Sequence, residues 1–89
     1  MPKELLDITS KKFIGKRLGS LYKRHAFSRK SFVLFLENKD GSERRRLGSD
    51  PNLSLIIMKN SDYSQYPIAS ISKYYDEFHV VINPPEENE

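Results

Sequence analysis

The chain has 89 residues, of which 37% are hydrophobic, 30% are charged and none is cysteine, and its net charge is +3. A chain of this length buries roughly 60–65% of the surface that its unfolded form exposes, which is enough for one core and too little for two. The lack of cysteine excludes disulfides, thiolate metal sites and cysteine nucleophiles. Because no apolar run reaches the length of a signal peptide or a membrane span, we expect a cytoplasmic protein.

The first ambiguous segment is residues 12–24, where apolar residues fit both the spacing of a helix and one face of a strand. Gly15 and Gly19 would each cost a helix interior about 1 kcal/mol relative to alanine. No acidic residue occupies a first-turn position, and a strand tolerates glycine at a bend or bulge. We therefore favour a long bent strand over 12–24 and keep a helix as the alternative.

Residues 31–38 form an apolar run that ends at the turn sequence Lys39-Asp40-Gly41-Ser42. An Asp-Gly pair after such a run predicts a β-hairpin with a two-residue loop. In that register Glu37 lies opposite Arg44, Leu36 opposite Arg45 and Phe35 opposite Arg46, and Leu34 would lie opposite Leu47. The face that carries Phe32, Leu34, Leu36 and Leu47 is then the predicted core face.

Three consecutive arginines on one strand cannot point the same way, because strand side chains alternate. We expect Arg45 to lie on the side of Leu34 and Leu36 and to reach solvent from there. Arg44 and Arg46 then stand together on the opposite face beside Phe35, either as phosphate ligands or, for Arg44, as a partner of Glu37.

The second half of the chain predicts three more strands. Residues 53–59 follow a Pro-containing breaker and have an apolar centre, and we expect a strand there. Residues 67–72 and 77–82 alternate or are rich in β-branched residues, and they are expected to pair as a second hairpin. Pro84 and Pro85 end the last strand.

These elements predict an all-β or β-rich fold, a small barrel or two-layer roll of about five to six mostly antiparallel strands with no long helix. We expect one domain over residues 1–83 and a disordered acidic tail over residues 84–89.

Positive and negative charge are sorted along the chain. Residues 1–48 hold 13 Lys and Arg against 5 Asp and Glu, a net of +8, whereas residues 49–89 hold 2 against 7, a net of −5. Basic groups with interleaved aromatic residues are typical of polyanion sites, because cations contact phosphates and aromatic rings stack on bases. The sequence therefore predicts a nucleic-acid-binding surface, for DNA or RNA, formed by Lys11, Lys12, Lys16, Arg17, Tyr22, Lys23, Arg24, Phe27, Arg29, Lys30, Arg44 and Arg46.

Other interpretations of the same charges stay open. The two halves can simply lie against each other, or the chain can be a protein-interaction module or a small subunit that contacts an acidic partner. If the chain is such an interaction module or subunit, its tyrosine-rich second half would contact a further protein, and a homodimer is possible. An anionic membrane surface is the least favoured partner, since no lipid anchor or long amphipathic helix is evident.

No residue pattern of catalytic or metal-binding type is present. His25 and His79 lie 54 positions apart without ligand spacing, and the carboxylates fall in predicted loops. The serines lack a nucleophile motif, and the glycines form neither a dinucleotide fingerprint nor a phosphate loop. We therefore expect a non-enzymatic protein without a cofactor.

Overall fold

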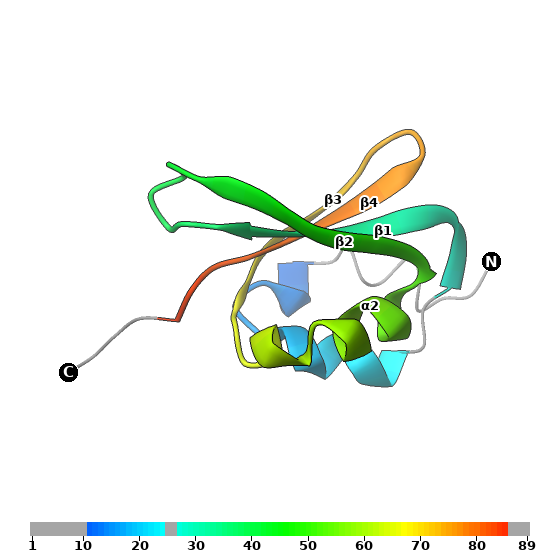
Figure 1. Cartoon of the computed structure of the whole chain (residues 1–89), viewed down its shortest axis with the longest axis horizontal. Coiled ribbons are helices and arrows are strands. Elements are labelled where there is room, and N and C mark those ends of the chain that lie inside the picture. The colour runs from blue at the N-terminus through cyan, green and yellow to red at the C-terminus, as the bar shows by residue number, and fades with distance from the viewer. Residues whose placement is uncertain (1–10, 25–26, 86–89) are drawn as a thin grey trace.

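The computed structural model describes residues 11–24 and 27–85, and Figure 1 shows their arrangement. Side chains are described throughout these ranges except at Lys12, Lys23, Arg24 and residues 27–30. The expected acidic tail lies outside the described residues from position 86 onward. The elements in chain order are η1 (Lys11–Phe13), η2 (Leu18–Arg24), β1 (Phe27–Glu37), β2 (Arg44–Asn52), α2 (Leu53–Lys59), η3 (Ser61–Tyr63), β3 (Ile68–Lys73) and β4 (Glu77–Ile82).

Two antiparallel hairpins lie side by side and form one mixed sheet with the order β2-β1-β4-β3. The central strands β1 and β4 are parallel to each other. The chain leaves the sheet at the edge strand β2 and returns at the opposite edge strand β3, so its connection crosses one face of the sheet. That connection contains α2 and η3, and Figure 1 shows the helical segments on this one face. The sheet is open, which corrects the predicted barrel and its five to six strands.

The hydrophobic core lies between the sheet and the helical layer. Phe32 of β1 stacks on Phe78 of β4 with their ring centroids 5.2 Å apart. These rings are covered by buried residues from every helical element except η3, among them Phe13, Leu18, Leu21, Leu53, Ile56 and Ile57. The predicted core face of the first hairpin is confirmed, because Phe32 and Leu34 are buried and Leu36 and Leu47 pack against the same cluster.

The strand predicted over residues 53–59 is wrong, because this segment is the helix α2. Its buried residues are Leu53, Ile56 and Ile57, and that spacing follows a helical period, not an alternating one. The Asn52 side chain accepts hydrogen bonds from the backbone N–H groups of Ser54 and Leu55 at 2.9 and 3.3 Å. A capped first turn and a continuous apolar stripe outweigh the modest strand preference of the isoleucines.

The strand predicted over residues 12–24 is also wrong, because the segment contains the two 3-10 helices η1 and η2. Gly15 follows η1 with φ +89°, a conformation open to glycine. Its N–H donates to the Ile68 carbonyl at 2.8 Å, and the Ile68 N–H donates to Lys16 at 2.8 Å. The segment therefore adds only a short contact to the edge of β3, while Leu18 and Leu21 turn inward to the core.

The first hairpin confirms the predicted pairs Phe35 with Arg46, Leu36 with Arg45 and Glu37 with Arg44. A register shift follows, so that Leu34 lies opposite Gly48 and not opposite Leu47 as predicted. An extra residue on β2 at this point bends the strand.

The turn of that hairpin encloses Lys39 and Asp40, because the Gly41 N–H donates to the Asn38 carbonyl at 2.8 Å. Gly41 itself has φ +78°. The Asp40 carboxylate accepts from the Ser42 N–H at 2.9 Å. Hydrogen bonds from the side chain and then the backbone of Ser42 hold the pKa of Asp40 below its usual value.

The second predicted hairpin is confirmed, with β3 and β4 antiparallel and Ile71 opposite Val80. None of the helices in the described part of the chain has the length and hydrophobicity needed to cross a membrane.

Candidate nucleic-acid interface

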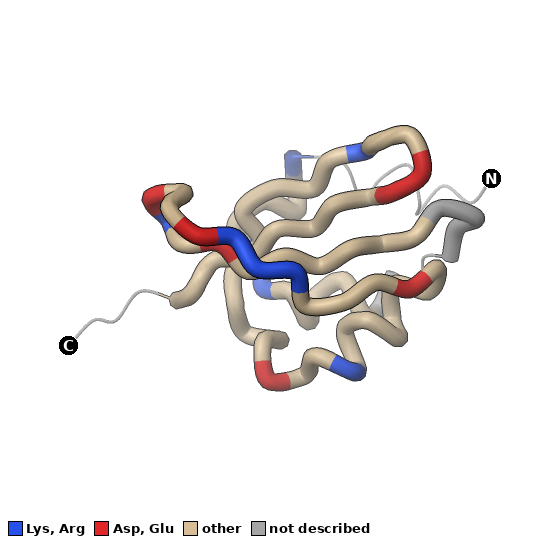
Figure 2. Tube along the Cα trace, turned by 45° about the horizontal axis from the view of Figure 1, so that its top comes forward, with Lys and Arg blue, Asp and Glu red and all other residues tan. Residues whose placement is uncertain are grey.

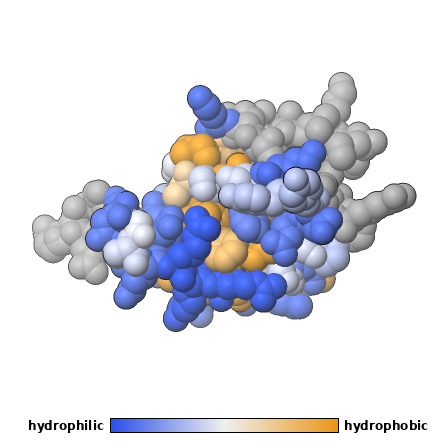
Figure 3. Space-filling view, turned by 90° about the horizontal axis from the view of Figure 1, so that it is seen from above, coloured by the Kyte–Doolittle hydropathy of each residue, from blue (hydrophilic) through white to orange (hydrophobic). Residues whose placement is uncertain are grey.

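One face of the sheet carries no helix among the described residues, and it is referred to below as the open face. Residues paired on neighbouring strands point to the same side of a sheet. Phe35 is opposite both Arg46 of β2 and Val81 of β4, and Val33 is opposite His79. The open face therefore carries Ser31, Val33, Phe35, Glu37, Arg44, Arg46, Ser49, Ser70, Ser72, Glu77, His79 and Val81. Val33 and Val81 are buried between their neighbours. Figure 3 views this side and shows apolar atoms in its middle with hydrophilic groups around them.

Three ring-bearing side chains form a row across the strands of the open face. The ring centroids of Phe35 and His79 are 5.0 Å apart in an edge-on arrangement. His79 in turn contacts Tyr74, which follows β3, with the centroids 4.3 Å apart and the rings tilted by 37°. We call Phe35, His79 and Tyr74 the aromatic row. It runs from β1 over β4 to the end of β3.

Arg44 and Arg46 stand beside one end of this row. The Arg44 guanidinium carbon lies 5.0 Å from the centre of the Phe35 ring, within the range of a cation–π contact. Arg44 also pairs with Glu37 at 3.4 Å, and its side chain is 46% exposed. Arg46 donates to the neutral hydroxyl of Ser49 at 2.8 Å, which does not compensate its charge. This end of the open face is therefore cationic.

The other end of the open face is acidic. Glu77 lies opposite Ser31, two residues before His79 on β4. Its carboxylate is 2.7 Å from the His79 Nε2 atom, so it fixes the orientation of the imidazole. Figure 2 shows the basic run on β2 and the acidic turn between β3 and β4 at separate ends of the sheet. A phosphate backbone would be attracted to the arginine end.

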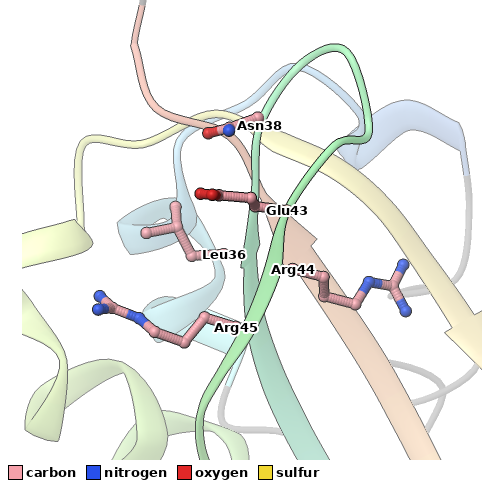
Figure 4. A pocket seen from close by; sticks show the side chains of 5 residues that line it. All are labelled: Leu36, Asn38, Glu43, Arg44 and Arg45. Atoms are coloured by element: carbon pink, nitrogen blue, oxygen red, sulfur yellow. The ribbon is translucent and has the colours of Figure 1, made fainter.

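Arg45 points away from Arg44, as Figure 4 shows, which confirms the predicted alternation. It lies opposite Leu36 and donates to the Tyr63 hydroxyl at 3.1 Å. A depression of about 540 Å³ is found here, lined by Leu36, Asn38, Glu43, Arg44 and Arg45. Because Arg45 is on the helical side of the sheet, it does not add to the charge of the open face.

The structure does not bring all the described members of the predicted surface together. Arg17 forms a bridge with Pro67, next to the edge strand β3, and donates to the Gln65 side chain at 2.8 Å. Arg44 and Arg46 are on β2, the opposite edge of the sheet. Lys11 at the start of η1 and Lys16 just before η2 are both exposed.

Tyr22 is 44% exposed on η2, and its carbonyl accepts a hydrogen bond from Ser54 of α2. It therefore belongs to the helical layer. The remaining predicted side chains lie outside the described part of the structure, namely Lys12, Lys23, Arg24, Phe27, Arg29 and Lys30.

Sequence reasoning placed Phe35 beside Arg44 and Arg46, but it did not include His79 or Tyr74 in the site. His79 lies on β4, within the strand predicted over residues 77–82, and Tyr74 lies between β3 and β4, in the link of the second predicted hairpin. Their approach to Phe35 depends on the parallel pairing of β1 with β4. The alternation of residues 77–82 was the available signal for the face of His79.

Among the described residues, no group of three or more His, Cys, Asp and Glu side chains is arranged to hold a metal ion. No protein-family model, no curated protein and no solved structure matches the chain. Its function is therefore inferred from the chemistry of its own surface.

Proposed function

We propose that this protein binds nucleic acid, without catalysing a reaction, through the arginine end of the open face. The observation that carries the proposal is that Arg44 and Arg46 lie on the same side of β2, on the open face and beside Phe35. Two cations and an aromatic ring on one surface provide both contacts that a nucleic acid offers, to its phosphates and to its bases.

The two arginines are suited to phosphate binding because the guanidinium group presents paired donors that match two phosphate oxygens. The present partner of Arg44 is Glu37, and solvent reaches both side chains, which are 46% and 25% exposed. An exposed ion pair contributes only about 0–1 kcal/mol, so a phosphate can replace the carboxylate at low cost. Arg46 needs to give up only a serine hydroxyl.

The test is a fluorescence-anisotropy titration of labelled DNA and RNA, single-stranded and double-stranded, at two salt concentrations. The site variant is Arg44→Gln/Arg46→Gln. The matched control is Lys16→Gln/Arg17→Gln, which lowers the net charge equally but changes the opposite edge of the sheet. Hydrogen bonds to charged groups contribute about 1.5–3 kcal/mol each, so we expect the site variant to lose at least about tenfold in affinity. The control should lose less than about threefold.

Two outcomes would overturn the proposal. If the wild-type protein binds no nucleic acid at low salt, the basic half is a protein-facing surface, and capture of an acidic protein partner becomes the next experiment. If the control variant loses as much affinity as the site variant, binding follows net charge and the open face is not the site.

A further inference from the structure

We infer that the ligand of the open face is single-stranded and that the aromatic row stacks on its unpaired bases, an inference that rests on the proposed nucleic-acid function. The row begins at Phe35 under the Arg44 guanidinium and ends at Tyr74. The row therefore offers the exposed Tyr74 ring for stacking at one end and the Arg44 guanidinium over Phe35 at the other, with His79 between them. Aromatic side chains on a sheet are a common platform for splayed bases of single strands.

The length of the row fits a short run of nucleotides. Its two ends lie on β1 and just after β3, which are separated by β4 in the sheet. Two strand spacings amount to roughly 10 Å. Because this length exceeds the rise of about 3.4 Å between successive stacked nucleotides, the row can contact more than one base.

The rings of the aromatic row protrude too little from the sheet to enter a groove of a duplex. Phe35 is only partly exposed, and the His79 side chain is 19% exposed. Side chains that read a duplex must enter a groove about 8 Å deep on a protruding helix or ribbon. Rings that lie this low in a sheet can reach a base only where the base turns its flat face outward, as in a single strand.

Small side chains leave room for bases beside the row. Ser72 lies opposite His79, and Ser70 lies opposite Val81, both on the open face of β3. On the other side of β1, Ser49 lies opposite Val33. Serines at these positions keep neighbouring strands from covering the rings.

Tyr74 is the most accessible member of the row and is held in place by the backbone. It is 53% exposed, and its N–H donates to the Glu77 carbonyl at 2.7 Å. Its ring rests against His79, and the His79 ring also contacts Phe35 and the Glu77 carboxylate. The ring is therefore oriented before a base arrives, which lowers the entropy cost of stacking.

The experiment compares Tyr74→Ala with Tyr75→Ala, a matched control in the same turn. Tyr75 is 94% exposed and is not part of the aromatic row. The probes are a fluorescein-labelled oligothymidine of 12 nucleotides and a labelled 12-base-pair duplex at the same salt concentration. Loss of one stacked base weakens binding about 5- to 100-fold, so we expect this loss for Tyr74→Ala on the single strand. Tyr75→Ala should change the affinity less than twofold, and Tyr74→Phe should retain wild-type affinity.

The inference is overturned if the duplex binds as tightly as the single strand, or if Tyr74→Ala binds the single strand as well as the wild type does. In either case a loss of binding in Arg44→Gln/Arg46→Gln would leave the proposed function intact. If the wild-type protein binds neither probe, the proposed function itself fails. Circular dichroism of each variant separates a lost contact from a lost fold, and Tyr74→Phe tests the ring even if Tyr74→Ala unfolds.

Discussion

Individual residues decide where the first hairpin turns and which way its cations point. Gly41 adopts φ +78° at the turn, a region that costs other residues roughly 1–2 kcal/mol. Beyond the turn, the alternation of β2 sends Arg45 to the Tyr63 hydroxyl and leaves Arg44 and Arg46 on the open face. Gly41 therefore allows the turn after which Arg44, Arg45 and Arg46 pair with β1.

At this scale we predict that Gly41→Ala destabilises the protein by about 1–2 kcal/mol, because an L side chain is strained at positive φ. Gly48→Ala is the control. A Cβ atom at Gly48 would meet only the Asn60 side-chain nitrogen, at 3.9 Å, and alanine suits a strand better than glycine. Urea unfolding should show a loss for the first variant and none for the second. Equal losses would mean that backbone strain at the turn is not the cause.

Secondary-structure elements could be predicted from the sequence where residues close together in the chain determine them. Both hairpins follow from turn residues and alternating apolar residues over a few positions, and both are confirmed. Residues 53–59 are the contrary case, because β-branched composition indicated a strand and the buried positions follow a helix. Asn52 was available as a helix start signal, since its side chain caps the first turn.

We predict that Asn52→Ala destabilises the protein by about 0.5–2 kcal/mol, because two backbone N–H groups at the start of α2 lose their acceptor. Asn52→Asp keeps an acceptor oxygen at the same place and should remain close to wild type. Thermal unfolding of both variants checks this expectation. A loss in Asn52→Asp as large as in Asn52→Ala would assign the effect to the amide nitrogen and not to the cap.

On the scale of the whole molecule, the fold distributes the basic half over two edges of one sheet. Arg17 lies at the β3 edge and Arg44 at the β2 edge, so a short ligand on the open face meets only part of the charge. The arginines and Pro51 also protect the edge strand β2 from pairing with a second copy. Under the proposed function, charge on this strand therefore serves both to bind the ligand and to protect the edge.

The salt dependence of binding tests this distribution. Each phosphate contact to a single strand contributes about 0.7 to the slope of log affinity against log salt concentration. We predict that Arg44→Gln/Arg46→Gln lowers the magnitude of this slope by roughly 1.4, the amount for two such contacts. Tyr74→Ala should weaken binding with the slope unchanged, since stacking releases no counterions. The expectation fails if the arginine variant keeps the wild-type slope.

The sequence by itself determined the two hairpins, the alternation of Arg44, Arg45 and Arg46 and the sorting of charge along the chain. These features depend on composition or on contacts between residues close in the chain. Only the tertiary structure decided that β1 pairs in parallel with β4, which brings Phe35 to His79. It also decided that residues 53–59 are helical and that Arg17 lies far from Arg44 in the strand order. The order of the strands and the placement of the helices depend on packing between apolar surfaces that are far apart in the sequence. No local sequence pattern contains that information.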